Sequence, residues 1–164
     1  MFDLSEQRSL DCAINLGCMG GGWMTVGIDH VIKNAPYSTE EDYPYLAKKG
    51  ECNPQKSSAN LVVNKRVSGS GTDHLAEVLA TYSPSVAVDA SSWSTYKGGV
   101  MSVCGTSLNH GVQVVGVKDG NWVVRNSWGK RWGIEYADST KGYIELAKGD
   151  TCGISTEIHY LVAE

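Results

Sequence analysis

The chain has 164 residues, with 14 basic and 18 acidic side chains and a formal net charge of −4. This length suits one domain of ordinary size or two small lobes that share a core. Because the sequence contains no basic run, we expect neither nucleic acid nor an anionic membrane as a partner. No apolar run is long enough to span a bilayer, and residues 1–4 lack the pattern of a targeting segment.

The cysteines are well separated and form neither a CxxC pair nor a Cys/His cluster with zinc spacing, so we expect no metal site and no cofactor. Separated cysteines in a glycine-rich chain are typical of a disulfide framework in an oxidising compartment. Their odd number leaves one thiol without a partner. They are Cys12, Cys18, Cys52, Cys104 and Cys152.

The first predicted helix begins after Ser5, a residue type that caps helix N-termini, and has acidic Glu6 in its first turn. Glycines at positions 20–22 precede a second segment, residues 23–32, which has partial helical periodicity. Glycines suit a surface on which an extended peptide pairs with backbone groups. They suit equally a simple turn into the helix, and both interpretations can hold together.

A polar stretch separates these helices from the first predicted strand, residues 61–67, and we expect a boundary between two lobes close to this strand. Asp73 is expected to cap a helix that continues to Tyr82. The helix is expected to provide packing, because its apolar side chains share one face. They are Leu75, Val78, Leu79 and Tyr82.

Two valine-rich runs, residues 112–117 and 122–124, predict a β-hairpin. Asp119 and Gly120 lie between them and have the composition that tight hairpin turns favour, since glycine adopts positive φ without steric cost. The hairpin returns the chain so that His110 opens one strand and Asn126 closes the next. The sequence leaves the register open, and a one-residue shift would move a side chain to the other face of the sheet.

An imidazole held by a neutral amide is an arrangement that a cysteine nucleophile uses, because the His takes the thiol proton and the Asn fixes the His tautomer. His110 and Asn126 are therefore candidate catalytic residues, and Trp128 would shield them from water. The alternative is that His110 is a hydrogen-bonded structural histidine beside a valine-rich strand.

Several segments of the chain resemble papain-like cysteine proteases. Residues 109–111 (Asn-His-Gly) and 125–129 (Arg-Asn-Ser-Trp-Gly) match the family's His and Asn motifs, and residues 132–133 (Trp-Gly) follow where the family has a second Trp-Gly. Residues 86–93 and 96–101 look most like the cathepsin L branch, particularly the cruzipain-type enzymes. The match runs in order over nearly the whole chain, which makes it more specific than any single motif.

The resemblance implies an α+β, papain-like two-lobe fold, with an incomplete helical left lobe at residues 1–60 and an antiparallel β-barrel right lobe at residues 61–164. It also implies the disulfides Cys12–Cys52 and Cys104–Cys152, each worth about 3 to 4 kcal/mol in the chain-entropy model. The substrate-binding residues that it implies are Gly20, Gly21, Ala87, Gly111, Trp128 and Glu157. For Glu157, the alternative is a solvated carboxylate at a strand edge.

The sequence departs from the family pattern at two places. Residues 4–12 resemble a segment that follows the catalytic cysteine, so the nucleophile, the oxyanion-hole Gln and the central helix are expected to be missing from this chain. Cys18 matches the cysteine whose partner lies just before that nucleophile, and we expect it to be unpaired or intermolecular; the alternative is that it serves as the nucleophile. Residues 133–146 carry an insertion, which we expect on a surface loop near the cleft rim.

The predicted function is a portion of a papain-like cysteine endopeptidase that retains His110 and Asn126 and has negligible activity alone. The alternative is a non-catalytic protein that binds peptides in the same cleft. Expected partners are an extended peptide or protein substrate and, for the incomplete lobe, a complementing amino-terminal segment or a second copy. Exposure of Leu10, Val26 and Ile28 would favour such association. The family and the cysteines imply a lysosomal or secreted protein.

Overall fold

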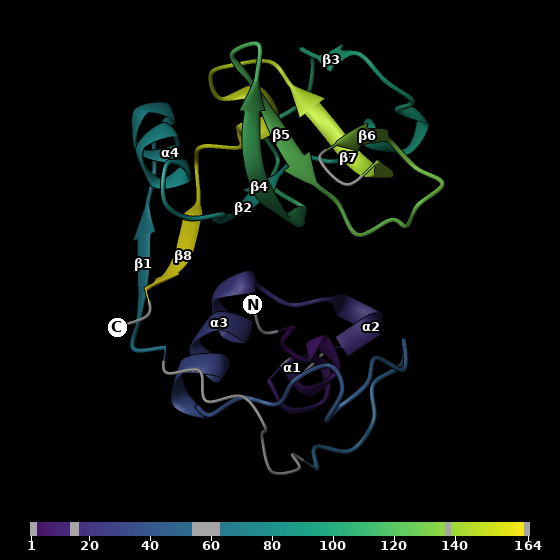
Figure 1. Ribbon diagram of the computed structural model, residues 1–164. Helices are drawn as coiled ribbons and strands as arrows, with labels where there is room; N and C mark the ends of the chain where they lie inside the picture. Colours follow the sequence, from purple (N-terminus) through teal and green to yellow (C-terminus); the bar gives the residue numbers. More distant parts are fainter. Residues whose placement is uncertain (1–2, 14–16, 54–62, 137–138, 163–164) are drawn as a thin grey trace. The chain divides into compact units, whose positions relative to one another are not determined.

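The computed structural model describes residues 3–13, 17–53, 63–136 and 139–162, and it divides into two compact units. The first unit consists of residues 1–67 and 161–164, and the second of residues 68–160 (Figure 1). The chain passes between them within two strands, β1 (Lys65–Gly69) and β8 (Ile158–Val162). The strand predicted at residues 61–67 begins later, at Lys65, and Leu61 and Val62 lie outside the described residues.

The helices in the described part of the first unit are α1 (Glu6–Cys12), α2 (Gly17–Gly20) and α3 (Met24–Lys33). The predicted N-cap is confirmed, because the Ser5 hydroxyl oxygen accepts a hydrogen bond from the Arg8 backbone N–H at 2.9 Å. Among the described residues, the buried apolar cluster of this unit is small and consists of Val31, Tyr37 and Val63. The unit therefore needs other interactions to hold its loops.

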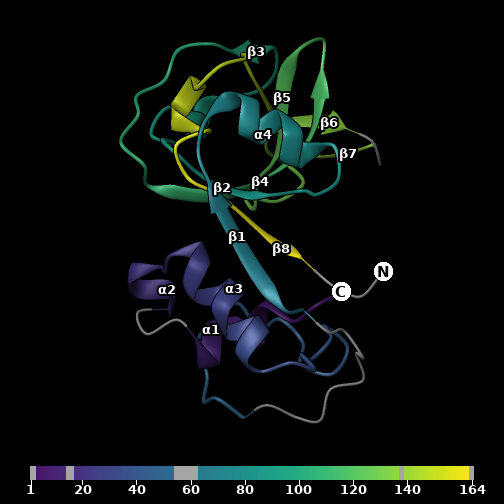
Figure 2. The ribbon, with the colours of Figure 1, turned by 90° about the vertical axis from the view of Figure 1, so that its left-hand side faces the viewer.

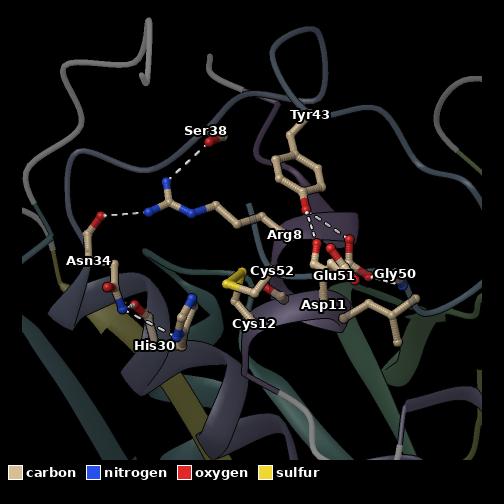
Figure 3. The surroundings of a disulfide bond; sticks show 12 residues. Arg8, Asp11, Cys12, His30, Asn34, Ser38, Tyr43, Gly50, Glu51 and Cys52 are labelled. Carbon is tan, nitrogen blue, oxygen red and sulfur yellow. Dashed lines mark hydrogen bonds between the residues drawn. A yellow bond between two sulfur atoms is a disulfide. The ribbon is translucent and has the colours of Figure 1, made fainter. Parts of the chain in front are cut away.

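Buried polar groups provide part of this stabilisation. The Arg8 guanidinium is largely buried and lies 4.2 Å from the centre of the Tyr37 ring. It donates to the Ser38 hydroxyl at 3.1 Å and to the Asn34 carbonyl at 3.5 Å (Figure 3). A buried guanidinium is tolerated when its terminal N–H groups are hydrogen-bonded, as both terminal nitrogens of Arg8 are, and its face packs on an aromatic ring. Arg8 thus ties α1 to the loop that follows α3.

Asp11 joins the same helix to a second loop. Its carboxylate accepts hydrogen bonds from the Gly50 backbone N–H at 2.6 Å and the Tyr43 hydroxyl at 2.9 Å (Figure 3). It also accepts one from the Gln7 amide at 2.8 Å. Burial alone would raise the pKa of Asp11, but these hydrogen bonds outweigh it and lower the pKa below its usual value. The adjacent disulfide Cys12–Cys52 closes the same loop covalently.

The second unit is built on a sheet whose strands follow the order β1-β8-β2-β4-β5-β7-β3, with β6 paired to β7. The β2–β4, β2–β8, β4–β5, β5–β7 and β6–β7 pairs are antiparallel, and β3 pairs with β7 in parallel. The predicted α+β class and antiparallel sheet are confirmed. The path is open between β1 and β3 in the described chain, so the strands do not form the closed barrel that was expected. The strand bounds are β2 Ser85–Val88, β3 Val100–Met101, β4 His110–Lys118, β5 Asn121–Arg125, β6 Ile134–Tyr136 and β7 Thr140–Leu146.

Helix α4 (Thr72–Leu79) packs on one side of this sheet (Figures 1 and 2). Its N-cap is Gly71 and not the expected Asp73, which lies in the first turn, and the helix ends at Leu79, before Tyr82. Leu75 and Val78 are buried, as the apolar spacing predicts. Leu75 joins a large core with side chains of the central strands and of two short 3-10 helices, η1 (Trp93–Thr95) and η2 (Thr151–Gly153).

The β4–β5 hairpin turns at Asp119 and Gly120, as predicted, and both residues have positive φ, 50° and 82°. Near the turn, Gly116 lies opposite Val123, but beyond it Val114 lies opposite Val124. Val115 is therefore an extra residue in β4, a β-bulge that shifts the register by one.

No helix in the described parts of the chain is long and apolar enough to cross a membrane.

Candidate active site

The hairpin brings His110 and Asn126 together at its open end. The His110 Nε2 atom lies 2.8 Å from the Asn126 Oδ1 atom, a hydrogen-bond distance. His110 is the first residue of β4, half-buried, and Asn126 follows β5 and is 9% exposed. The backbone N–H of Asn126 donates to the Gly142 carbonyl at 2.9 Å, which anchors it to β7.

The hydrogen bonds of Asn126 fix the state of the imidazole. The Asn126 Oδ1 atom also accepts the Ser127 backbone N–H at 2.8 Å, so this atom is the carbonyl oxygen and not the amide nitrogen. An oxygen acceptor requires His110 Nε2 to carry a proton and to donate it. In the neutral ring, Nδ1 is then the unprotonated nitrogen, and it makes no hydrogen bond to a described residue. The site thus offers a base at Nδ1.

Three tryptophans surround this pair. The Trp128 ring, 40% exposed, lies 5.3 Å from the His110 ring between centroids, and the buried Trp93 ring meets His110 edge-on at 6.3 Å. Trp132 stacks on Trp93 at 6.2 Å and donates its indole N–H to the Trp93 carbonyl at 2.9 Å. Apolar rings exclude water from the His–Asn hydrogen bond, which strengthens it. Trp128 therefore lies where a side chain that shields His110 from water is expected. Trp93, which the sequence did not single out, packs against His110 from inside the core.

A second feature that the sequence did not reveal is a hydrogen-bond network just before His110. The Asp89 carboxylate accepts the Ser91 backbone N–H at 3.0 Å, the Ser107 backbone N–H at 3.1 Å and the Asn109 amide at 3.3 Å. Hydrogen bonds, first from Ser91 and then from Ser107 and Asn109, lower the pKa of Asp89. The network fixes the loop that enters β4 at His110. The signal in the sequence was a carboxylate directly after a buried strand, with an Asn directly before the His.

Three of the predicted substrate-binding residues meet on neighbouring strands. Ala87 in β2 lies opposite Gly111 in β4, and the Ala87 backbone N–H donates to the Glu157 carbonyl at 3.3 Å. The space above Gly111 is open, since a Cβ built there would meet no atom within 4 Å. The Glu157 side chain is half-buried, with a carboxylate oxygen 3.4 Å from His159 Nε2. Their role in binding stays a prediction.

The remaining predicted residues lie in the first unit. Gly20 ends α2, and Gly21 follows it with a φ of 67°. Cys18 is an exposed free thiol in α2. The other four cysteines form the disulfides Cys12–Cys52 and Cys104–Cys152. The roles of Gly20 and Gly21 in peptide binding stay predictions.

The inserted segment after Trp132 forms an antiparallel strand pair, β6 and β7, where a surface loop was expected. It borders two hollows of about 230 and 240 Å³ in the second unit. The first hollow is lined by Asn126 itself and by Arg125, Lys130 and Lys141, among others. Ala137 and Asp138 of the insertion lie outside the described residues.

Comparison with known proteins gives consistent results. The sequence model for "Papain family cysteine protease" matches residues 1–162. Cathepsin L 2 of Paramecium tetraurelia is 43% identical over 157 residues, which cover 93% of this chain and 48% of the relative. Macrodontain-1 of Ananas macrodontes is 37% identical over 163 residues, which cover 93% of this chain and 73% of the relative.

The fold agrees with this match. The solved structure of the bromelain protease from Ananas comosus, in complex with the E64 inhibitor, aligns with a TM-score of 0.84 and 33% sequence identity, covering 100% of this chain and 80% of that chain. The chain spans about half the length of the first curated relatives that it matches, 48% for both Paramecium proteins.

Proposed function

Because the chain belongs to the papain family of cysteine proteases, we propose that it is the His- and Asn-bearing portion of a cysteine endopeptidase. The single observation that carries this proposal is the 2.8 Å hydrogen bond from His110 Nε2 to Asn126 Oδ1, because it leaves Nδ1 as a base. In this proposal the helical lobe is residues 1–60 and the sheet lobe is residues 61–164.

The reaction that such a pair supports is peptide-bond hydrolysis through an acyl-enzyme. His110 Nδ1 accepts the proton of a cysteine thiol, and Asn126 stabilises the imidazolium by accepting from Nε2. The thiolate sulfur bonds to the carbonyl carbon of the peptide, and the imidazolium returns its proton to the leaving amine as the C–N bond breaks. His110 then takes a proton from water, whose oxygen attacks the thioester and releases the carboxylic acid and the thiol.

The source of the thiol is the second part of the proposal. Four of the five cysteines are in disulfides, and the fifth, Cys18, belongs to the other compact unit. We assign the nucleophile to none of them, and we expect it to come from polypeptide outside these 164 residues. The chain alone is then inactive or nearly so, since loss of a nucleophile costs several orders of magnitude in rate.

The first unit offers a surface for such a complementing segment, or for a second copy of the chain. Met19 is 97% exposed and Val26 is 46% exposed, so an apolar strip of α2 and α3 faces outward. Leu10 and Ile28, which were expected to be exposed as well, are half-buried. The disulfides fit an oxidising compartment, and a lysosomal or secreted location is part of the proposal.

The experiment is labelling by a cysteine-directed peptidyl electrophile after an amino-terminal segment that carries the family's catalytic cysteine is supplied in trans. We expect labelling of the added segment's cysteine, with a rate that falls at least a hundredfold in His110→Ala and less in Asn126→Ala. His74→Gln is the matched control, since it removes a histidine of the same unit. Cys18→Ser shows whether any label resides on this chain.

The alternative function is a non-catalytic protein that binds peptides. The disulfide bonding of four cysteines is the observation that favours it, because it leaves one free thiol in the chain. This function predicts peptide binding without turnover and without labelling in the presence of the added segment. Labelling that is unchanged in His110→Ala would contradict the endopeptidase proposal.

A further inference from the structure

The two hollows beside the β6–β7 insertion share a chemical character. The first is lined by Arg125, Lys130 and Lys141, and the second by Lys97, Arg131 and, again, Lys141. Five of the 14 basic residues of a net acidic chain thus gather around two neighbouring hollows. We call these five residues the basic rim.

The basic rim is not neutralised by described carboxylates. None of its five cations forms an ion pair within the described ranges, whereas Lys118 on the neighbouring hairpin is 3.5 Å from Glu145. Among the residues that the structure describes, no aspartate or glutamate lines either hollow. Glu135 is the strand partner of Lys141, but it lines neither hollow, and no ion pair joins the two. Several unpaired cations around a concavity favour an anionic ligand.

The position of the rim links it to the catalytic candidates. Arg125 directly precedes Asn126, and Asn126 itself lines the first hollow with Ser127. Trp132, which stacks on the Trp93 ring beside His110, lines the second. A ligand in the first hollow therefore lies beside Asn126, and the second hollow is connected to His110 through the Trp132 and Trp93 rings, within the same compact unit.

We propose that the basic rim binds an acidic segment of the polypeptide that the His110–Asn126 site acts on. The inference rests on the proposed function for the identity of the ligand as a polypeptide. Each hollow, at about 230 to 240 Å³, has room for a few side chains, and Lys141 lines both. Carboxylates of two nearby Asp or Glu residues would pair with the lysines and arginines, and long-range attraction would orient the segment before contact.

Binding without turnover tests the proposal. Fluorescence anisotropy is measured with a labelled peptide that carries four glutamates and with the same peptide carrying glutamines. We expect the acidic peptide to bind at least tenfold more tightly at low salt and to lose this advantage as salt rises. Since one exposed ion pair is worth about two- to fivefold in affinity, Lys130→Gln/Arg131→Gln/Lys141→Gln is expected to weaken binding about tenfold or more.

Matched variants separate charge from folding. Lys130→Arg/Lys141→Arg keeps the charges and should retain binding, and Lys148→Gln removes one exposed cation of the same unit outside the two hollows and should change binding less than twofold. Glu135→Gln should tighten binding about twofold, because it removes the nearest strand-paired carboxylate.

The outcomes distinguish this inference from the function on which it rests. Equal binding of the acidic and neutral peptides, or equal loss in Lys148→Gln and in the triple variant, overturns the inference whatever the labelling experiment gives. Inorganic sulfate or a sulfated polysaccharide is added as a competitor of the labelled acidic peptide. If either displaces it more strongly than the unlabelled acidic peptide does at equal ionic strength, the assignment of the ligand as a polypeptide is overturned. Retained acidic-peptide binding in His110→Ala supports the rim as a separate determinant, even where the chain fails to complete an active protease.

Discussion

The two compact units hold their long loops in place by different kinds of interaction. The second unit buries a large apolar core between its sheet, α4 and the two 3-10 helices. In the described part of the first unit, the buried apolar cluster is only Val31, Tyr37 and Val63, while Arg8, Asp11 and other polar side chains are buried beside it. Polar networks are directional, so they fail when one partner is lost, whereas an apolar core tolerates local change better.

Both units nevertheless repeat one device, a carboxylate that accepts backbone N–H groups beside a disulfide. Asp11 accepts from Gly50 near Cys12–Cys52. Asp89 accepts from Ser91 and Ser107, and its own backbone N–H donates to the Cys152 carbonyl at 2.8 Å. In the second unit the device is added to a core that is already extensive. In the first unit, where the described apolar cluster is small, we expect it to carry a larger share of the stability.

Removing each disulfide is the strongest test of this difference. The bridges span similar separations, 40 and 48 residues, so loss of either costs about 4 kcal/mol in the chain-entropy model. We expect Cys12→Ser/Cys52→Ser to unfold the first unit, while Cys104→Ser/Cys152→Ser leaves the second unit folded with a lower melting temperature. Amide hydrogen exchange resolved by residue measures this, and equal loss of protection in both units would contradict the comparison.

A core substitution tests the other side of the comparison, that apolar burial stabilises the second unit more than the first. Ile144 is fully buried in β7, and Ile144→Ala should lower the free energy of unfolding of the second unit by about 3 kcal/mol through lost burial and a cavity. Val31→Ala, in the small cluster of the first unit, removes less buried surface and should cost about 1 to 2 kcal/mol. Denaturant unfolding followed by exchange protection separates the two effects. A larger loss for Val31→Ala would show that the small cluster is the more important.

Arg8→Met tests the polar network of the first unit. Methionine retains the apolar stem but removes the donors to Ser38 and Asn34 and the charge over Tyr37. We expect a loss of about 1 to 3 kcal/mol, since buried acceptors are left unsatisfied. Arg66→Met is the control, because Arg66 is a partly exposed arginine paired with Asp29 and should cost at most about 1 kcal/mol. Similar losses for the two variants would argue against the buried network.

The smallest effect is a pH dependence that the two carboxylates share. Hydrogen bonds lower the pKa of both Asp11 and Asp89 in the folded chain, so unfolding lets each bind a proton more readily. Their stabilisation is complete above the ordinary aspartate pKa of about 3.9 and is lost as the pH falls through the lower folded pKa. We expect Asp11→Asn and Asp89→Asn each to weaken the loss of stability at low pH in its own unit. Thermal unfolding between pH 2 and pH 6 measures this pH dependence. An unchanged pH dependence in both variants would contradict its assignment to Asp11 and Asp89.

Much of this architecture follows from local sequence signals. The cap at Ser5, the turn at Asp119 and Gly120 and the apolar face of Leu75 and Val78 act through neighbouring residues, and the structure confirms each. The signals that failed depend on more distant parts of the chain. The start of β1, the end of α4 and the strand pairing of the insertion were wrong because tertiary pairing sets those boundaries.

The candidate site was predictable as residue types but not as geometry. The motifs indicate a histidine and an asparagine, whereas their shared face depends on the bulge at Val115, which no composition signal marks. The supporting Asp89 network and the basic rim were also not foreseen, because each assembles residues far apart in the sequence.

The bulge has a consequence for any change of hairpin length. In the register set by the turn, Asn126 would fall opposite Gln113, whose side chain alternates to the face away from His110. With the extra residue, Gln113 pairs with Arg125, and continuing this register by one residue puts Asn126 opposite Val112, on the same face as His110. We therefore expect one residue added to or removed from either strand of the hairpin to put the imidazole and the amide on opposite faces. Equal changes in both strands would keep them on the same face.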